Sequence, residues 1–259
     1  VLSAVGDFDE DELRKQVEAL FGAPPAPLVA SAPFNPRVRE PDFTNVRVKL
    51  TEDELKDAHL HFGFQIEGVS HPDTAALDVL AMVLGQGDAS RLALEVRRKR
   101  NLARDVNSWA WTPKERGLFA ASIIAAPATL AQAFEESVRV MTTMTRVEAE
   151  ADEVETVKAL IEAEAVYQRE TVQGLARKLG YYESMAGGLE REAAYYEAIS
   201  QVTPAQLREV AAKYFTFDRA GVSGLLPKGT PFSESAAREV LQRVSSSRPD
   251  SLPARVRAA

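Results

Sequence analysis

Residues 84–106, LGQGDASRLALEVRRKRNLARDV, join a glycine-containing turn to a strongly basic helix. The turn GQGD follows an apolar helical stripe and not a strand, and no Gly-Lys-Ser or Gly-Lys-Thr opens the next helix. A P-loop needs Gly-Lys-Ser or Gly-Lys-Thr at the start of its helix, and a dinucleotide-binding loop must follow a strand. Asp88 would also repel a phosphate. The segment therefore predicts a tight turn between two helices, with Asp88 or Ser90 capping the second one.

The basic run that follows is the densest positive patch of the chain, and it holds Arg97, Arg98, Lys99, Arg100 and Arg104. A nucleic-acid site is disfavoured because the run has no interleaved aromatic residues and the whole chain carries a net charge of −7. Two interpretations stay open. The run is either a solvated helix end, where cations meet the negative end of the helix dipole, or it contains an arginine that holds the carboxylates or carbonyls of a bound chain.

The composition excludes several other classes of protein. With 259 residues, the chain is long enough for one large domain or two modest ones. It has no cysteine, which excludes disulfides, cysteine zinc sites and thiol nucleophiles. There is no run of about 18 apolar residues, so no membrane span is predicted. The first residues, VLSAVGDFD, lack an initiator Met and are typical of the interior of a longer polypeptide.

Proline content and apolar patterning divide the chain into four parts. Residues 1–22 hold a short apolar strand and a helix, and we interpret them as the last strand and helix of a preceding homologous domain. Residues 23–45 contain six prolines and predict an extended linker. Residues 46–226 are predicted to form one complete domain. Residues 227–259 are predicted to be a partly disordered C-terminal tail with a short helix at 234–244.

Hydrophobic periodicity predicts an α+β fold. Alternating apolar residues indicate five strands. These strands are expected near 44–50, 59–67, 104–112, 117–125 and 220–226. Apolar stripes at helical spacing lie between them, and Thr203-Pro-Ala-Gln206 forms a capping box that begins a helix. We expect a mainly antiparallel sheet with helices packed on one face.

Metal and catalytic motifs are scarce. The chain has three histidines, and two of them, His59 and His61, share one face of a predicted strand with Glu67. That geometry would allow two histidines to bind a metal, but an ordinary polar sheet face is the favoured explanation. Neither His-Glu-x-x-His nor His-x-x-Glu-His occurs, and there is no Gly-x-Ser-x-Gly. The sequence predicts no catalytic residue and no metal ligand in this chain.

Several segments, taken in order, resemble the insulinase/pitrilysin zinc metallopeptidases, a family that includes the mitochondrial processing peptidases. The segments are DAHLHFGF (57–64), LDVLAMVLGQGDASRLALEVRRKRNLARDV (77–106), GLFAASI (117–123), YYEAISQVTPAQLREVAAKYF (195–215) and the final strand. The resemblance covers 46–226 as one complete domain and 1–22 as the tail of another. It is specific as a set, although no single motif would suffice.

The resemblance implies a non-catalytic role. In this family, homologous α+β domains occur in tandem or as partner subunits. The N-terminal one carries His-x-x-Glu-His and binds zinc, whereas the C-terminal one lacks zinc and closes a chamber over the peptide. Without that motif, this chain is similar to the C-terminal half, with no cofactor of its own. The implied partners are a homologous zinc-bearing domain, on the same chain or on a separate subunit, and a peptide substrate. The alternative is a non-catalytic homologue that serves as a structural or assembly subunit.

The resemblance also points to two site residues. In the family, an arginine and a tyrosine seven residues later hydrogen-bond the peptide near the scissile bond. Arg97 occupies the arginine position here, but the tyrosine position holds Arg104. A guanidinium can donate to a carbonyl oxygen, although it adds a charge. Arg97 and Arg104 are therefore the candidate substrate-binding residues. We expect this pair to bind peptides more weakly than the family's arginine and tyrosine, or to favour acidic peptides. The alternative is that this homologue no longer processes peptides.

Overall fold

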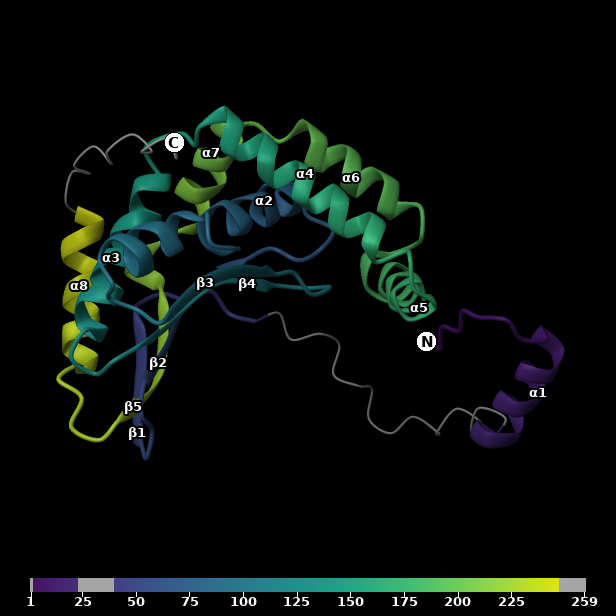
Figure 1. The fold of residues 1–259 in the computed structure, drawn as a ribbon, viewed down its shortest axis with the longest axis horizontal. Coiled ribbons are helices and arrows are strands. Elements are labelled where there is room, and N and C mark those ends of the chain that lie inside the picture. Colours follow the sequence, from purple (N-terminus) through teal and green to yellow (C-terminus); the bar gives the residue numbers. More distant parts are fainter. Residues whose placement is uncertain (1, 23–39, 247–259) are drawn as a thin grey trace.

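The described part of the chain contains one five-stranded sheet (Figure 1). The structure is a computed structural model that describes residues 2–22 and 40–246. The strands are β1 (Arg47–Asp53), β2 (Ala58–Ile66), β3 (Asp105–Trp111), β4 (Gly117–Ala125) and β5 (Gly221–Pro227). Their order is β1-β5-β2-β4-β3, and only the β1–β5 pair is parallel. The predicted α+β fold with a mainly antiparallel sheet is confirmed.

The central strand β2 shows why the sheet has two different faces. Leu60, Phe62 and Phe64 are buried, whereas His59 and His61 between them lie on the opposite face. The ring of Phe62 meets Phe134 edge to face at 5.2 Å, and the ring of Phe64 lies 5.0 Å from Phe215. Because side chains alternate along a strand, one face of β2 is committed to the helix layer and the other is left open.

The described chain also contains helices, all of which except α1 lie on the apolar side of the sheet (Figure 1). They are α1 (Glu10–Phe21), α2 (Thr74–Gly85), the π-helix η1 (Ala93–Lys99), α3 (Leu130–Met144), α4 (Ala151–Tyr167), α5 (Val172–Tyr181), the π-helix η2 (Tyr182–Ala186), α6 (Arg191–Gln201), α7 (Pro204–Tyr214), the 3-10 helix η3 (Phe217–Arg219) and α8 (Glu234–Ser246). Figure 1 shows α2, α3, α7 and α8 close to the sheet, with α4, α5 and α6 extending beyond α2. None of the described helices is both long and apolar enough to cross a membrane.

The predicted capping box of α7 is confirmed. Thr203 accepts from the backbone N–H of Gln206, and the Gln206 side chain accepts from the backbone N–H of Thr203. At the other end of α7, Tyr214 Oη donates to Asp73 Oδ2 at 2.7 Å, and Lys213 Nζ does so at 2.6 Å. These bonds fasten the end of α7 to the start of α2.

The turn GQGD does separate two helices, but neither predicted cap forms. Ser90 Oγ donates to the carbonyl oxygen of Gly87 at 2.8 Å, so its hydrogen bond is made inside the turn. The Asp88 carboxylate accepts from Arg97. The expectation that Asp88 or Ser90 caps the next helix was therefore wrong, because both side chains have nearer partners, and Leu92 precedes η1 without a side-chain cap.

The helix expected at 234–244 is present as α8, but the packing at both ends of the described chain differs from the expectation. Residues 2–6 form no strand, Leu2 is exposed, and α1 has no buried residue. A strand needs a neighbour for its backbone groups, and within the described residues none lies beside 2–6. At the other end, α8 packs on α3 and buries Ala237 and Leu241, so the fold continues past residue 226. Residues 23–39 of the predicted linker and 247–259 of the predicted tail lie outside the described residues.

A buried ion pair joins the helical residue Arg91, just before η1, to helix α4, and we expect it to be essential for stability. Arg91 donates through two nitrogens to Glu153, whose side chain is 4% exposed. Arg91→Met removes the cation and leaves a buried carboxylate, which we expect to cost about 3 kcal/mol in the free energy of unfolding. Urea unfolding measures this loss.

The matched control is Lys228→Met, which breaks the ion pair to Glu54. Those two side chains are 68% and 84% exposed, so the same change should cost less than about 1 kcal/mol. Equal losses in the two variants would contradict the structural role of the Arg91–Glu153 pair.

Candidate functional site

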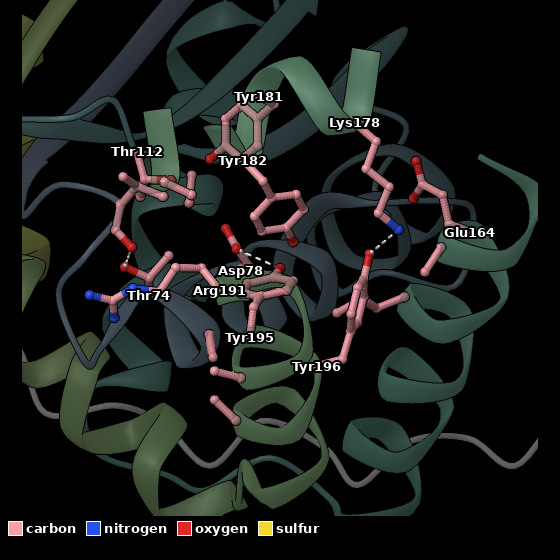
Figure 2. A pocket seen from close by; sticks show the side chains of 18 of the residues that line it. Thr74, Asp78, Thr112, Glu164, Lys178, Tyr181, Tyr182, Arg191, Tyr195 and Tyr196 are labelled. Carbon is pink, nitrogen blue, oxygen red and sulfur yellow. Dashed lines mark hydrogen bonds between the residues drawn. The ribbon is translucent and has the colours of Figure 1, made fainter. Parts of the chain in front are cut away.

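The helix layer encloses a cavity of about 760 Å³ beside the β3–β4 hairpin. Its walls come from α2, the end of β3, α4, α5, η2 and α6. Figure 2 shows that polar side chains from α2, α5, η2 and α6 converge there. A volume of this size is typical of ligand-binding pockets. The cavity is therefore the candidate functional site of the described chain.

Helix α2 contributes the carboxylate of Asp78. The helix, TAALDVLAMVLG, is otherwise apolar apart from Thr74. Leu77 and Leu80 face the core, whereas Thr74, Asp78 and Met82, spaced four residues apart, line the cavity. Residues at this spacing share one face of a helix. The helix therefore buries its apolar side under the fold and presents one acid to the cavity.

Two pairs of tyrosines line the same cavity. Tyr195 Oη donates to Asp78 Oδ2 at 2.8 Å. The rings of Tyr195 and Tyr196 are 5.2 Å apart, and those of Tyr181 and Tyr182 are 5.5 Å apart. In Figure 2, Asp78, Tyr182 and Tyr195 point toward one another. The result is a carboxylate held against aromatic rings.

The cavity environment changes the acidity of these groups. Burial raises the pKa of Asp78 to about 6, although the hydrogen bond from Tyr195 acts in the opposite direction. Burial and then the Asp78 charge raise the pKa of Tyr195, so its hydroxyl stays protonated and donates. Burial also raises the pKa of Tyr182. Asp78 is surrounded by protein on most sides but still borders the cavity.

A separate ion pair occupies another wall of the cavity. Lys178, on α5, is buried, and its ammonium lies 2.5 Å from a carboxylate oxygen of Glu192. The same ammonium is 5.0 Å from the centre of the Tyr196 ring. Glu192 also pairs with Arg169. Lys178 is therefore neutralised by Glu192 and does not pair with Asp78.

The two arginines expected to bind substrate lie elsewhere. Arg97, in η1, donates to Asp88, and a second nitrogen is 4.0 Å from Asp105 at the start of β3. Arg104 donates through Nε to Asp57 at 2.8 Å. Neither arginine lines the cavity. Both belong to the region where β3 begins, and there they form ion pairs with acidic residues.

Two of the three histidines, His59 and His61, lie on the open face of the sheet. His61 packs edge to face on Trp109 at 5.9 Å, and burial, followed by the nearby His59, lowers its pKa. Across residues 2–22 and 40–246, no three His, Cys, Asp or Glu side chains gather closely enough to hold a metal ion. The donor set that zinc requires is therefore not assembled in the described chain.

Sequence reasoning missed the cavity, although two signals were present. One is the dipeptide Tyr-Tyr followed by Glu, which occurs at 181–183 and again at 195–197. The other is a lone acid, Asp78, inside an apolar helix. Buried acids without a cation are rare, so Asp78 was the stronger signal. Neither pattern reveals that α2, α5 and α6 meet.

Comparison with known proteins identifies the family. Residues 1–161 of the 259 match the family model described as the peptidase M16 inactive domain. More than half of the chain is matched, and this protein therefore belongs to the peptidase M16 inactive-domain family. The resemblance to the insulinase/pitrilysin metallopeptidases is confirmed.

Individual relatives agree with this assignment. Mitochondrial-processing peptidase subunit beta of Bos taurus is 27% identical over 161 residues, which are 57% of this chain and 32% of that protein. An uncharacterized zinc protease of Streptomyces coelicolor is 36% identical over 125 residues, 46% of this chain and 26% of that protein. The crystal structure of a protease from Helicobacter pylori has the same fold, with a TM-score of 0.76 at 22% identity over 86% of this chain and 54% of that one. This chain spans about a third or less of the curated relatives it matches.

The raised pKa of Asp78 predicts a pH-dependent stability. The folded state holds this proton up to about pH 6, whereas the unfolded chain releases it near pH 4. The contribution of Asp78 to the free energy of unfolding therefore falls as the pH rises from about 4 to 6, and it stays low above pH 6. Asp78→Asn keeps an acceptor for Tyr195 and removes the charge. We expect it to raise the free energy of unfolding at pH 7.5 by about 1–3 kcal/mol.

Urea unfolding of both proteins from pH 4 to 8 provides the measurement. The difference between variant and wild type should grow up to about pH 6 and then remain constant. Asp218→Asn, at an exposed carboxylate, is the matched control, and its difference should be small at every pH. A constant difference for Asp78→Asn would contradict the burial of an ionisable Asp78.

Proposed function

We propose that this chain is the C-terminal, non-catalytic half of a zinc metalloendopeptidase. In this proposal it closes the chamber and binds the peptide, while a homologous domain on the same chain or on a partner subunit supplies zinc. The observation that carries the proposal is the match to the peptidase M16 inactive domain in a chain without His-x-x-Glu-His. Relatives about three or more times the length of the matched segment, one of them named a zinc protease, support it.

The open face of the sheet is the surface that we propose to face the chamber. Strand pairing places Lys49, Ser223, His61, Ser122 and Asn107 in one row across this face. Leu225, on the next row, is 47% exposed, and Trp111, two rows away in the opposite direction, is 60% exposed. A face with polar groups and exposed large apolar side chains is suited to contact with another chain.

We also propose that Arg97 binds the peptide and that Arg104 modifies the selectivity. Asp105 lies in the same row as His59, so the Arg97 guanidinium is close to one end of the open face. Its partner Asp88 is 83% exposed, and such surface ion pairs are weak, so a peptide carbonyl or carboxylate can replace Asp88. Arg104 is held by Asp57 and places a second cation nearby, which favours acidic peptides.

We predict that the isolated chain retains no stoichiometric zinc and cleaves no peptide. The reason is that the zinc motif is missing from the sequence and that the described histidines have no third ligand beside them. Elemental analysis after dialysis, with a generic fluorogenic peptide assay, checks this. One zinc per chain, together with cleavage that a chelator abolishes, would show the prediction to be wrong.

A second prediction concerns the arginines, in an enzyme assembled from this chain and its zinc-bearing half. Arg97→Ala should lower kcat/KM by about ten- to a hundredfold, the effect of losing one charge-assisted hydrogen bond. Arg104→Tyr restores the residue type of the family pattern, and we expect it to reduce the preference for acidic over neutral peptides. Steady-state kinetics on one acidic and one neutral peptide measure both effects.

Arg98→Ala is the matched control for Arg97→Ala. It removes the same charge from the adjacent position of η1, where the side chain is exposed. Its kcat/KM should stay within about twofold of wild type. If the two alanine variants behave alike, Arg97 has no specific role in gripping the peptide.

A further inference from the structure

The Asp78 carboxylate lacks a cation. In the described chain, its hydrogen-bond donor is Tyr195, and no Lys, Arg or His forms an ion pair with it. A buried carboxylate is costly to ionise without a positive partner. The fold nevertheless places this one at a cavity wall, where a ligand can reach it. The protein therefore supplies the anion of an ion pair, and a ligand can supply the cation.

The basic side chains that line the cavity form no ion pair with Asp78 in the described chain. Lys178 pairs with Glu192 and lies over the ring of Tyr196. His71 Nδ1 accepts from the backbone N–H of Asp73 at 3.1 Å. Arg177 and Arg191 are exposed. These contacts leave the Asp78 charge available to a group that comes from outside the chain.

The aromatic rings around Asp78 complement the same kind of group. Tyr182 and Tyr195 flank the carboxylate in Figure 2, with Tyr181 and Tyr196 packed against them. Tyrosine faces attract ammonium and guanidinium groups, and the attraction grows when the cation is desolvated. Lys178 over Tyr196 shows this contact already in use on one wall.

We propose that this cavity binds an organic cation, an ammonium or guanidinium group on a chain the size of a lysine or arginine side chain. Asp78 is its counter-ion, and the faces of Tyr182 and Tyr195 are its aromatic contacts. The cavity, at about 760 Å³, is larger than one such side chain and has room for the residues on either side of it. The cation can come from a peptide side chain or from a free polyamine-like molecule.

Isothermal titration calorimetry of the 259-residue chain tests this with three probes. Nα-acetyl-arginine methylamide represents a peptide side chain, and agmatine represents a free organic cation. Nα-acetyl-citrulline methylamide has nearly the same shape without the charge. We expect the arginine compound to bind at least tenfold more tightly than the citrulline compound. The stronger of the arginine compound and agmatine identifies the source of the cation.

Variants connect the binding to Asp78. Asp78→Asn retains the acceptor for Tyr195, and its folding is checked by circular dichroism. We expect it to weaken binding of the cationic probes at least tenfold, whereas Asp218→Asn, at an exposed carboxylate outside the cavity, leaves binding unchanged. Equal affinity for arginine and citrulline, unchanged affinity in Asp78→Asn, or no binding of either cation would overturn the proposal.

This site goes beyond the proposed peptidase role, and the titrations need no cleavage. A negative result would therefore leave the proposed function standing. Conversely, cation binding would persist in a chain that serves only as an assembly subunit. The two proposals can thus fail separately.

Discussion

Burial of Leu60, Phe62 and Phe64 beneath the helices determines the orientation of the whole sheet. Phe62 packs against Phe134, and Phe64 packs against Phe215 and Phe217. A shift of β2 by one residue would therefore move these aromatic side chains to the other face. Because paired residues on neighbouring strands point to the same face, the residues of β4, β5 and the outer strands that are in register with Leu60, Phe62 and Phe64 also point toward the helices. The open face with His59 and His61 is a direct consequence.

The same constraint explains why the cavity contains an acid. Helix α2 must present its leucines to the sheet, and this fixes which side of the helix faces α5, η2 and α6. Asp78 occurs on that side, against apolar neighbours and tyrosine rings. A residue that destabilises the folded state at neutral pH is more readily explained by a ligand than by packing, because a leucine or asparagine there would cost less.

The pattern of neighbouring residues predicted the strands and the Thr203 cap. The features that it failed to predict depend on contacts between residues that are distant in the sequence or that compete for the same side chain. The β4 range was predicted without error, and the largest shift among the strands was three residues, at β1 (44–50 predicted, Arg47–Asp53 observed). Periodicity and the Thr203 cap are properties of neighbouring residues. The Asp88 and Ser90 caps failed because Arg97 and the Gly87 carbonyl compete for those side chains. The cavity was missed because Asp78 and Tyr195 are 117 residues apart, and only the packing of α2 on α6 brings them together.

The proposed role as the non-catalytic half predicts that a zinc-bearing partner needs this chain for cleavage. The most direct measurement titrates this chain into its homologous zinc-bearing domain, expressed separately from the same or the adjacent gene, while kcat/KM for an unstructured peptide is followed. We expect activity to rise more than tenfold and to saturate at one chain per zinc domain. Full activity of the zinc domain alone, or complex formation with no gain in cleavage, would contradict the account and favour a purely structural subunit.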